Sequence, residues 1–155
     1  MPDPLRAIVT YWQAVRQDRF APTWADFHLD ELDPQLVPWC SVVDVVDGGS
    51  DFTYRFWGTA RGALQRHDMT GKSVRDLSPP ELAEAVIGEY AKMLKRRKPV
   101  WFSQDVIVDD ERKFTYQYLR LPLSDDGETI DKIVAFSHNR RGFRELESMA
   151  EAGLK

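Results

Sequence analysis

Apolar residues recur along the chain first at helical spacing and later at strand spacing. Leu5, Ile8 and Trp12 follow one another at intervals of three to four residues, which predicts an amphipathic helix over about residues 4–18. A second stripe of the same kind predicts a long helix over about residues 79–96, ending in a basic run before Pro99. Each helix needs an apolar surface to cover.

Five β-rich runs supply that surface. The runs "CSVVDVV" and "DFTYRFW" are separated by Asp47, Gly48, Gly49 and Ser50, which predicts a hairpin. Three more runs, "VWFSQDVIV", "KFTYQYLRLPL" and "TIDKIVAFSH", follow the long helix. The order predicts an α+β domain built on one antiparallel sheet, with a core over about residues 38–140. Residues 1–155 are expected to form a single domain, with a tail over about residues 141–155.

The second β-rich run has no polar face. Alternation places Phe52, Tyr54 and Phe56 on one face and Thr53, Arg55 and Trp57 on the other. A strand that is apolar on both faces must be covered on both. We expect the N-terminal helix to cover the face of the two phenylalanines and the long helix to cover the face of Trp57.

The hairpin register suggests two roles for Arg55. A two-residue turn at Gly48 and Gly49 places Asp44 opposite Thr53, Val42 opposite Arg55 and Cys40 opposite Trp57. Asp44 then lies diagonal to Arg55, which predicts an ion pair across the strands. The alternative is that Arg55 points its guanidinium at an acidic ligand, with Trp57 stacking beside it.

Composition and charge exclude several classes of partner. Hydrophobic residues make up 43% and charged residues 30%, the balance of a soluble globular protein. The net charge of -4 and the pI near 5.4 argue against duplex nucleic acid and anionic membranes. Cys40 is the one cysteine, which excludes an internal disulfide and favours a reducing compartment. No apolar run approaches the roughly 20 residues of a membrane span, so we expect a cytoplasmic location.

Motifs of catalysis and metal binding are missing from the sequence. His28, His67 and His138 lie far apart, without the spacing of metal ligands. There is no phosphate-binding glycine loop, no dinucleotide fingerprint and no nucleophile elbow. We therefore expect a non-catalytic protein without a metal site.

Three stretches together resemble the PAS domains, a family of sensory modules. "YRFWGTARGALQRHDMTGKSVRDLSP" resembles the PAS second strand with its short helices, and "RLPLSDDGETIDKIVAF" resembles the fourth and fifth strands. "YWQAVRQDRFAPTWADF" with "PQLVPWCSVVDV" is similar to small bacterial single-domain PAS proteins. The resemblance implies a sheet order of 2-1-5-4-3, with the N-terminal helix on the outer face. It also implies a homodimer through that helix and the outer sheet face.

The resemblance also implies a pocket between the sheet and the helices. Trp57 occupies a position that faces the pocket in PAS domains, and the expected register adds its neighbours. The candidates are Arg55, Trp57, Cys40, Leu64, Tyr90, Ala135 and Ser137. Flavin is disfavoured because the Asn-Cys-Arg-Phe type of motif is missing, and haem because no histidine lies between residues 79 and 96.

The implied function is a stand-alone cytoplasmic signalling module that binds a small ligand, a protein partner or both. No kinase, cyclase or helix-turn-helix segment accompanies it, so the signal is expected to leave through partner binding. One alternative is an enzyme of the cone-shaped ketosteroid isomerase type, for which Asp44 and Tyr116 are the tempting pair. Another is a ligand-free dimerisation or scaffold domain whose pocket is filled by side chains such as Trp57.

Overall fold

The computed structural model describes residues 1–61, 67–107 and 113–138. The elements whose bounds lie within these ranges are α1 Asp3–Arg16, η1 Leu29–Glu31, η2 Val37–Trp39, β1 Cys40–Val46, β2 Asp51–Trp57, η3 Val74–Asp76, α3 Pro80–Arg96, β3 Val100–Ile107, β4 Lys113–Leu123 and β5 Lys132–His138. None of the helices in the described ranges is both long and apolar enough to cross a membrane.

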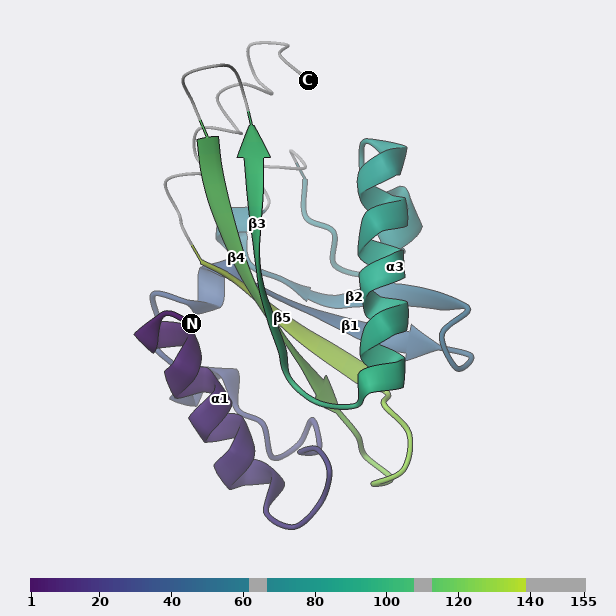
Figure 1. Ribbon diagram of the computed structural model, residues 1–155. Coiled ribbons are helices and arrows are strands. Elements are labelled where there is room, and N and C mark those ends of the chain that lie inside the picture. The colour runs from purple at the N-terminus through teal and green to yellow at the C-terminus, as the bar shows by residue number, and fades with distance from the viewer. Residues whose placement is uncertain (62–66, 108–112, 139–155) are drawn as a thin grey trace.

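The strands form one antiparallel sheet of order β2-β1-β5-β4-β3, which confirms the predicted α+β fold and strand order. Strand β1 lies between β2 and β5, and β4 joins β5 to the edge strand β3. Helices α1 and α3 lie on opposite sides of this sheet (Figure 1). We call the side under α1 the outer face and the side under α3 the inner face.

Helix α1 covers the outer face, as its apolar stripe predicts. Leu5, Ile8 and Trp12 are buried in one core with Leu121 of β4 and Val134 of β5. The Trp12 indole Nε1 donates a hydrogen bond of 2.9 Å to the backbone carbonyl of Pro122. Each large apolar side chain that is fully buried contributes about 1.5–3 kcal/mol to stability, so the burial of this stripe stabilises the packing of α1 on the sheet.

Helix α3 covers the inner face and builds a second core there. Tyr90 and Met93 of α3 are buried with Phe52 and Tyr54 of β2 and Ile133 of β5. The rings of Phe52 and Tyr90 are in contact, with 5.1 Å between their centroids. The sheet is therefore apolar on both faces because a helix lies on each.

A β-bulge overturns the predicted register beyond Tyr54. Val43 pairs with Tyr54 and Val42 with Phe56, so Arg55 is an extra residue in β2. The predicted pairs of Val42 with Arg55 and of Cys40 with Trp57 are therefore wrong, although Asp44 does pair with Thr53. A bulge shifts the alternation of side chains by one position.

The same bulge corrects the assignment of the aromatic residues to faces. Phe52, Tyr54 and Trp57 lie in the inner core, whereas Phe56 packs against the outer core. We expected Trp57 and Phe56 on opposite faces, and they are. We also expected Phe52 and Tyr54 to meet the N-terminal helix, and this was wrong because the shift occurs between Tyr54 and Phe56.

Candidate functional site

A row of side chains crosses the inner face from one edge of the sheet to the other. The strand pairings place Trp57, Ser41, Ala135, Arg120 and Val100 side by side in this row. Directly paired residues of antiparallel strands point to the same face. The two residues at the centre, Ser41 and Ala135, are small, and they separate the bulky Trp57 from Arg120.

Arg61 lies above the Trp57 end of this row. Helical backbone begins at Thr59, just after β2, so Arg61 is in the first turn. Its guanidinium carbon lies 4.9 Å from the centre of the Trp57 ring, which is a cation–π contact. Its Nη1 donates to the carbonyl of Trp39 at 3.2 Å and to the hydroxyl of Ser137 at 2.7 Å. These contacts hold the guanidinium against the inner face.

Arg120 forms the other end of the candidate site. Its side chain is only 7% exposed, and its guanidinium pairs with the Glu89 carboxylate of α3. The rings of Tyr90, Phe102 and Tyr118 surround the same guanidinium at 5.0, 5.1 and 5.7 Å. The carboxylate and the three rings offset most of the free-energy cost of removing this guanidinium from water.

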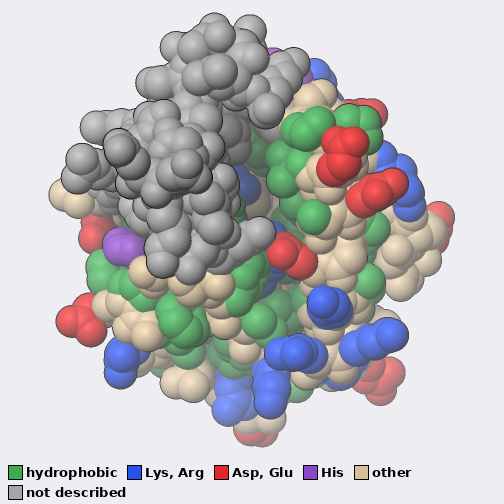
Figure 2. Space-filling view, turned by 45° about the horizontal axis from the view of Figure 1, so that its top comes forward, with side chains coloured by type: hydrophobic (Ala, Val, Ile, Leu, Met, Phe, Trp, Pro, Cys, Tyr) green, Lys and Arg blue, Asp and Glu red, His purple; other side chains and the backbone are tan. Residues whose placement is uncertain are grey.

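Several buried polar atoms near this row have no hydrogen-bond partner among the described residues. They are Ser41 Oγ, Trp57 Nε1, Arg61 Nε and Arg120 Nε, of which the three nitrogens are donors. Figure 2 shows Lys or Arg side chains, in blue, recessed beside helix α3. A buried donor without an acceptor costs about 1–3 kcal/mol, so an acceptor from outside the chain would stabilise this arrangement.

The positive charges of Arg61 and Arg120 affect the pKa values of two tyrosines near the site. Burial raises the pKa of Tyr54 strongly, and Arg61 and Arg120 both oppose that rise. Burial also raises the pKa of Tyr118, again against both arginines. Both tyrosines therefore stay neutral at physiological pH, within reach of two cations.

The structure brings together only some of the predicted pocket residues. Trp57, Tyr90 and Ser137 lie on the inner face, in contact with Arg61 or Arg120. Ala135 stands in the central row, two residues from Ser137 on β5. Leu64 lies outside the described residues.

Two predicted pocket residues lie elsewhere. Cys40 is fully buried in the outer core under α1, because it precedes Ser41 on a strand whose side chains alternate. Arg55 points to the outer face, where its Nε lies 2.9 Å from Asp44 Oδ1, and its side chain is 46% exposed. The predicted ion pair is confirmed, and the assignment of Arg55 and Cys40 to the pocket is wrong.

Sequence reasoning missed Arg61 and Arg120, the two cations of the site. Arg120 carried a usable signal, because it interrupts an apolar strand that needs cover on both faces. Arg61 carried none, since its contacts with Trp39, Trp57 and Ser137 come from three separate segments.

The inner face offers little to a metal ion or a cysteine-linked cofactor. The described residues include no group of three or more His, Cys, Asp or Glu side chains that could hold a metal. Cys40, the one cysteine, lies on the opposite side of the sheet from the candidate site. A cofactor that needs a thiol on the inner face therefore does not fit these residues.

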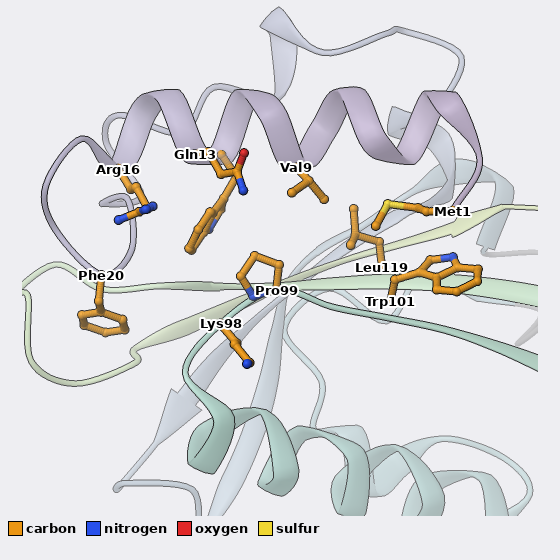
Figure 3. Close-up of a pocket in the computed structure, with 10 residues that line it drawn as sticks. Met1, Val9, Gln13, Arg16, Phe20, Lys98, Pro99, Trp101 and Leu119 are labelled. Atoms are coloured by element: carbon orange, nitrogen blue, oxygen red, sulfur yellow. The ribbon is translucent and has the colours of Figure 1, made fainter.

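A hollow lies on the outer side, between α1 and the start of β3. It is an open groove of about 490 Å³, and Val9, Gln13 and Arg16 line it from α1 (Figure 3). Lys98 and Trp101 line its other wall, and Trp101 is 37% exposed. None of the residues that line the groove carries a buried polar atom without a hydrogen-bond partner.

The chain is similar to several solved structures at low sequence identity. The PAS domain of BvgS from Bordetella pertussis is 16% identical, with a TM-score of 0.49, and the match covers 73% of this chain and 87% of that chain. The light-state dimer of the fungal blue-light photoreceptor Vivid is 13% identical, with a TM-score of 0.49, and the match covers 84% and 93%. The LOV domain of the Erythrobacter litoralis EL346 histidine kinase is 16% identical, with a TM-score of 0.41, and the match covers 64% and 92%.

The family comparison covers the five strands and helix α3, and leaves out helix α1. No curated protein matches the sequence. The model of the family described as "PAS fold" matches residues 37–145, which is more than half of the 155 residues. The chain therefore belongs to the PAS family of sensory and signalling modules.

Proposed function

We propose that the protein is a sensory module that binds a small molecule on the inner face and passes the signal to a protein partner. The observation that carries this proposal is the set of buried donors on the inner face, which come from β2, the turn after it and β4. Arg61, Arg120 and Trp57 each keep a buried N–H without a partner among the described residues. Each of these unpaired donors would lower the stability of a core that is filled only by side chains.

The two alternatives fit these contacts less well. The isomerase-type enzyme needs an acid or base inside the fold, but Asp44 lies on the outer face, paired with Arg55. The side chain of Tyr116 lies outside the described part of the chain. A closed scaffold domain would fill the inner face with apolar side chains, whereas this face holds two guanidiniums.

Native mass spectrometry of freshly purified protein tests the proposal. We expect a small molecule to stay with the protein in gentle conditions and to leave on denaturation. The same spectrum gives the oligomeric state and so tests the homodimer, which remains a prediction. A protein that carries no small molecule, and that binds none of the probes described below, would contradict the sensory proposal.

A further inference from the structure

Arg61 differs from the other arginine of the site in how its charge is balanced. Arg120 has the carboxylate of Glu89 beside it. Arg61 has a carbonyl, a hydroxyl and an aromatic ring, and no carboxylate among the described residues. These neighbours orient a cation but do not neutralise it. A partly buried guanidinium favours an anion beside it, since desolvation makes an unpaired charge costly.

The bonds of Arg61 also leave one of its donors unused by the described residues. A guanidinium carries two N–H groups on each terminal nitrogen and one on Nε. Both bonds to described residues use Nη1, and Nε is buried without a partner among those residues. Nε is therefore a donor without an acceptor among the described residues, and a guanidinium edge with two parallel N–H groups matches the two oxygens of a carboxylate.

The surroundings of this edge are apolar and aromatic. The Trp57 ring lies against the Arg61 guanidinium, and the Tyr54 ring lies 4.9 Å from the Trp57 ring. The small side chains Ser41 and Ala135 follow in the same row. Such a lining suits the apolar body of a ligand better than a bare, strongly hydrated ion.

We infer that the ligand is a small organic carboxylate, held by the Nε and Nη2 edge of Arg61, with its apolar body among the inner-face rings. This inference rests on the proposed sensory function. One uncompensated cation matches one negative charge, so a monoanion fits better than a phosphate dianion. Arg120 and Glu89 close the far side of the site as a neutral pair.

A purely structural role for Arg61 is the competing explanation. Its bonds to Trp39 and Ser137 connect the first helical turn to η2 and β5, which would brace the fold without any ligand. That role explains the use of Nη1 and of the Trp57 ring. It leaves the buried Nε unexplained.

Titration calorimetry with matched probes separates these explanations. The probes are phenylacetate and hexanoate, each compared with its uncharged amide, and inorganic phosphate. We expect the unmodified protein to bind at least one carboxylate about tenfold or more tightly than its amide, as the loss of a charged hydrogen bond to a buried group predicts. Arg61→Met should remove this preference. Arg61→Lys, which keeps the charge but not the two-pronged edge, should restore only part of it.

Arg55→Met is the matched control, because it removes an arginine of β2 that points to the outer face. It should bind the probes like the unmodified protein, and thermal unfolding should show that the Arg61 variants are folded. Equal binding of carboxylate and amide, a preference that survives Arg61→Met, or tighter binding of inorganic phosphate would overturn the inference while leaving the sensory proposal intact. If none of the probes binds and no molecule co-purifies, both fail.

Discussion

Arg55 and Asp44 form an ion pair that water reaches from the outer side. Their side chains are 46% and 30% exposed, and Arg55 Nε lies 2.9 Å from Asp44 Oδ1. Asp44 is also 3.8 Å from the Nζ of Lys132, whose side chain is only 11% exposed. Solvent weakens the first contact more than the second. The two partners of Asp44 therefore contribute unequally.

The two single variants and the double variant of Arg55 and Asp44 measure these contributions. Arg55→Ala should lower the free energy of unfolding by no more than about 1 kcal/mol, because the pair is exposed. Asp44→Ala should cost more, since it also leaves the ammonium of Lys132 with one fewer carboxylate. Urea unfolding should show a coupling between the two sites of a few tenths to about 1 kcal/mol. The exposed pair of Arg6 and Asp3 is the control, and equal coupling there would contradict a specific contact.

Asp126 caps the turn between β4 and β5 and should make stability depend on acid pH. The Thr129 hydroxyl and the amides of Thr129 and Glu128 donate to its carboxylate, which holds the pKa of Asp126 well below the ordinary aspartate value of 3.8. A carboxylate whose pKa is lowered by folding stabilises the fold fully above its unfolded pKa. That contribution is lost as the pH falls from about 4 toward the folded pKa.

Asp126→Asn removes this dependence. The variant should have a lower free energy of unfolding than the unmodified protein at neutral pH. This difference in free energy should become smaller when urea unfolding is repeated at pH values below about 4. Asp18→Asn, at an exposed position after α1, controls for the loss of one negative charge. A gap that stays constant across the acid range would mean that the Asp126 carboxylate is not specially stabilised.

At the scale of elements, the junction between β2 and the following helix depends on Gly58. Its amide donates to the Cys40 carbonyl at 2.8 Å. A Cβ at this position would lie 2.1 Å from the backbone oxygen of Pro38 and 2.8 Å from that of Cys40. Backbone atoms cannot rotate away as a flexible side chain can. The close approach places Trp57 and Arg61, on either side of Gly58, over the inner face.

Gly58→Ala should therefore destabilise the protein by about 1–3 kcal/mol, the usual cost of overpacking, as measured by chemical denaturation. Gly88→Ala is the matched control, because a Cβ there meets nothing within 4 Å on the exposed side of α3. Alanine in a helix interior should stabilise by about 0.5–1 kcal/mol. Changes of the same sign and size at both positions would show that the approach to Pro38 is looser than described.

The elements were predictable from sequence because their signals are local. The stripe that contains Leu5, Ile8 and Trp12 fixed α1, and the Asp47–Ser50 turn fixed the first hairpin and its register next to the turn. The bulge at Arg55 was not predictable, since an extra residue in a strand leaves no mark in the pattern of apolar positions. One missed residue was enough to place Arg55 and Cys40 in the pocket.

The candidate site was less predictable than the fold. Trp57 and the small residues of β5 followed from alternation along single strands. The partners of Arg61 did not, because Trp39, Trp57 and Ser137 meet only when three segments pack together. The pairing of Arg120 with Glu89 likewise depends on how α3 lies across the sheet.

At the scale of the whole molecule, two cores on opposite sides of the sheet serve different purposes. The outer core contains fully buried apolar side chains of α1, β1, β4 and β5. The inner core combines aromatic residues with the two guanidiniums. Because the apolar stripe of α1 is used within the chain, the predicted homodimer would need the outward side of α1 or the groove beside Trp101.

The closed outer core predicts the chemistry of Cys40. The thiol is fully buried, and burial raises its pKa well above the ordinary cysteine value. The native protein should therefore react with a thiol reagent such as dithionitrobenzoate only when it unfolds. The labelling rate in increasing urea should follow global unfolding measured by circular dichroism. Rapid labelling in buffer would mean that α1 opens from the sheet without global unfolding.

Binding of a small molecule on the inner face, between Arg61, Trp57 and α3, can be followed at single residues. The most direct test is a proton–nitrogen NMR spectrum of the indole N–H groups of the five tryptophans during titration with phenylacetate. We expect the Trp57 signal to shift, and the Trp12 signal, whose indole is bonded to Pro122 on the outer face, to stay in place. A shift of Trp12 or Trp101 without one of Trp57, or no shift at millimolar probe, would contradict binding on the inner face.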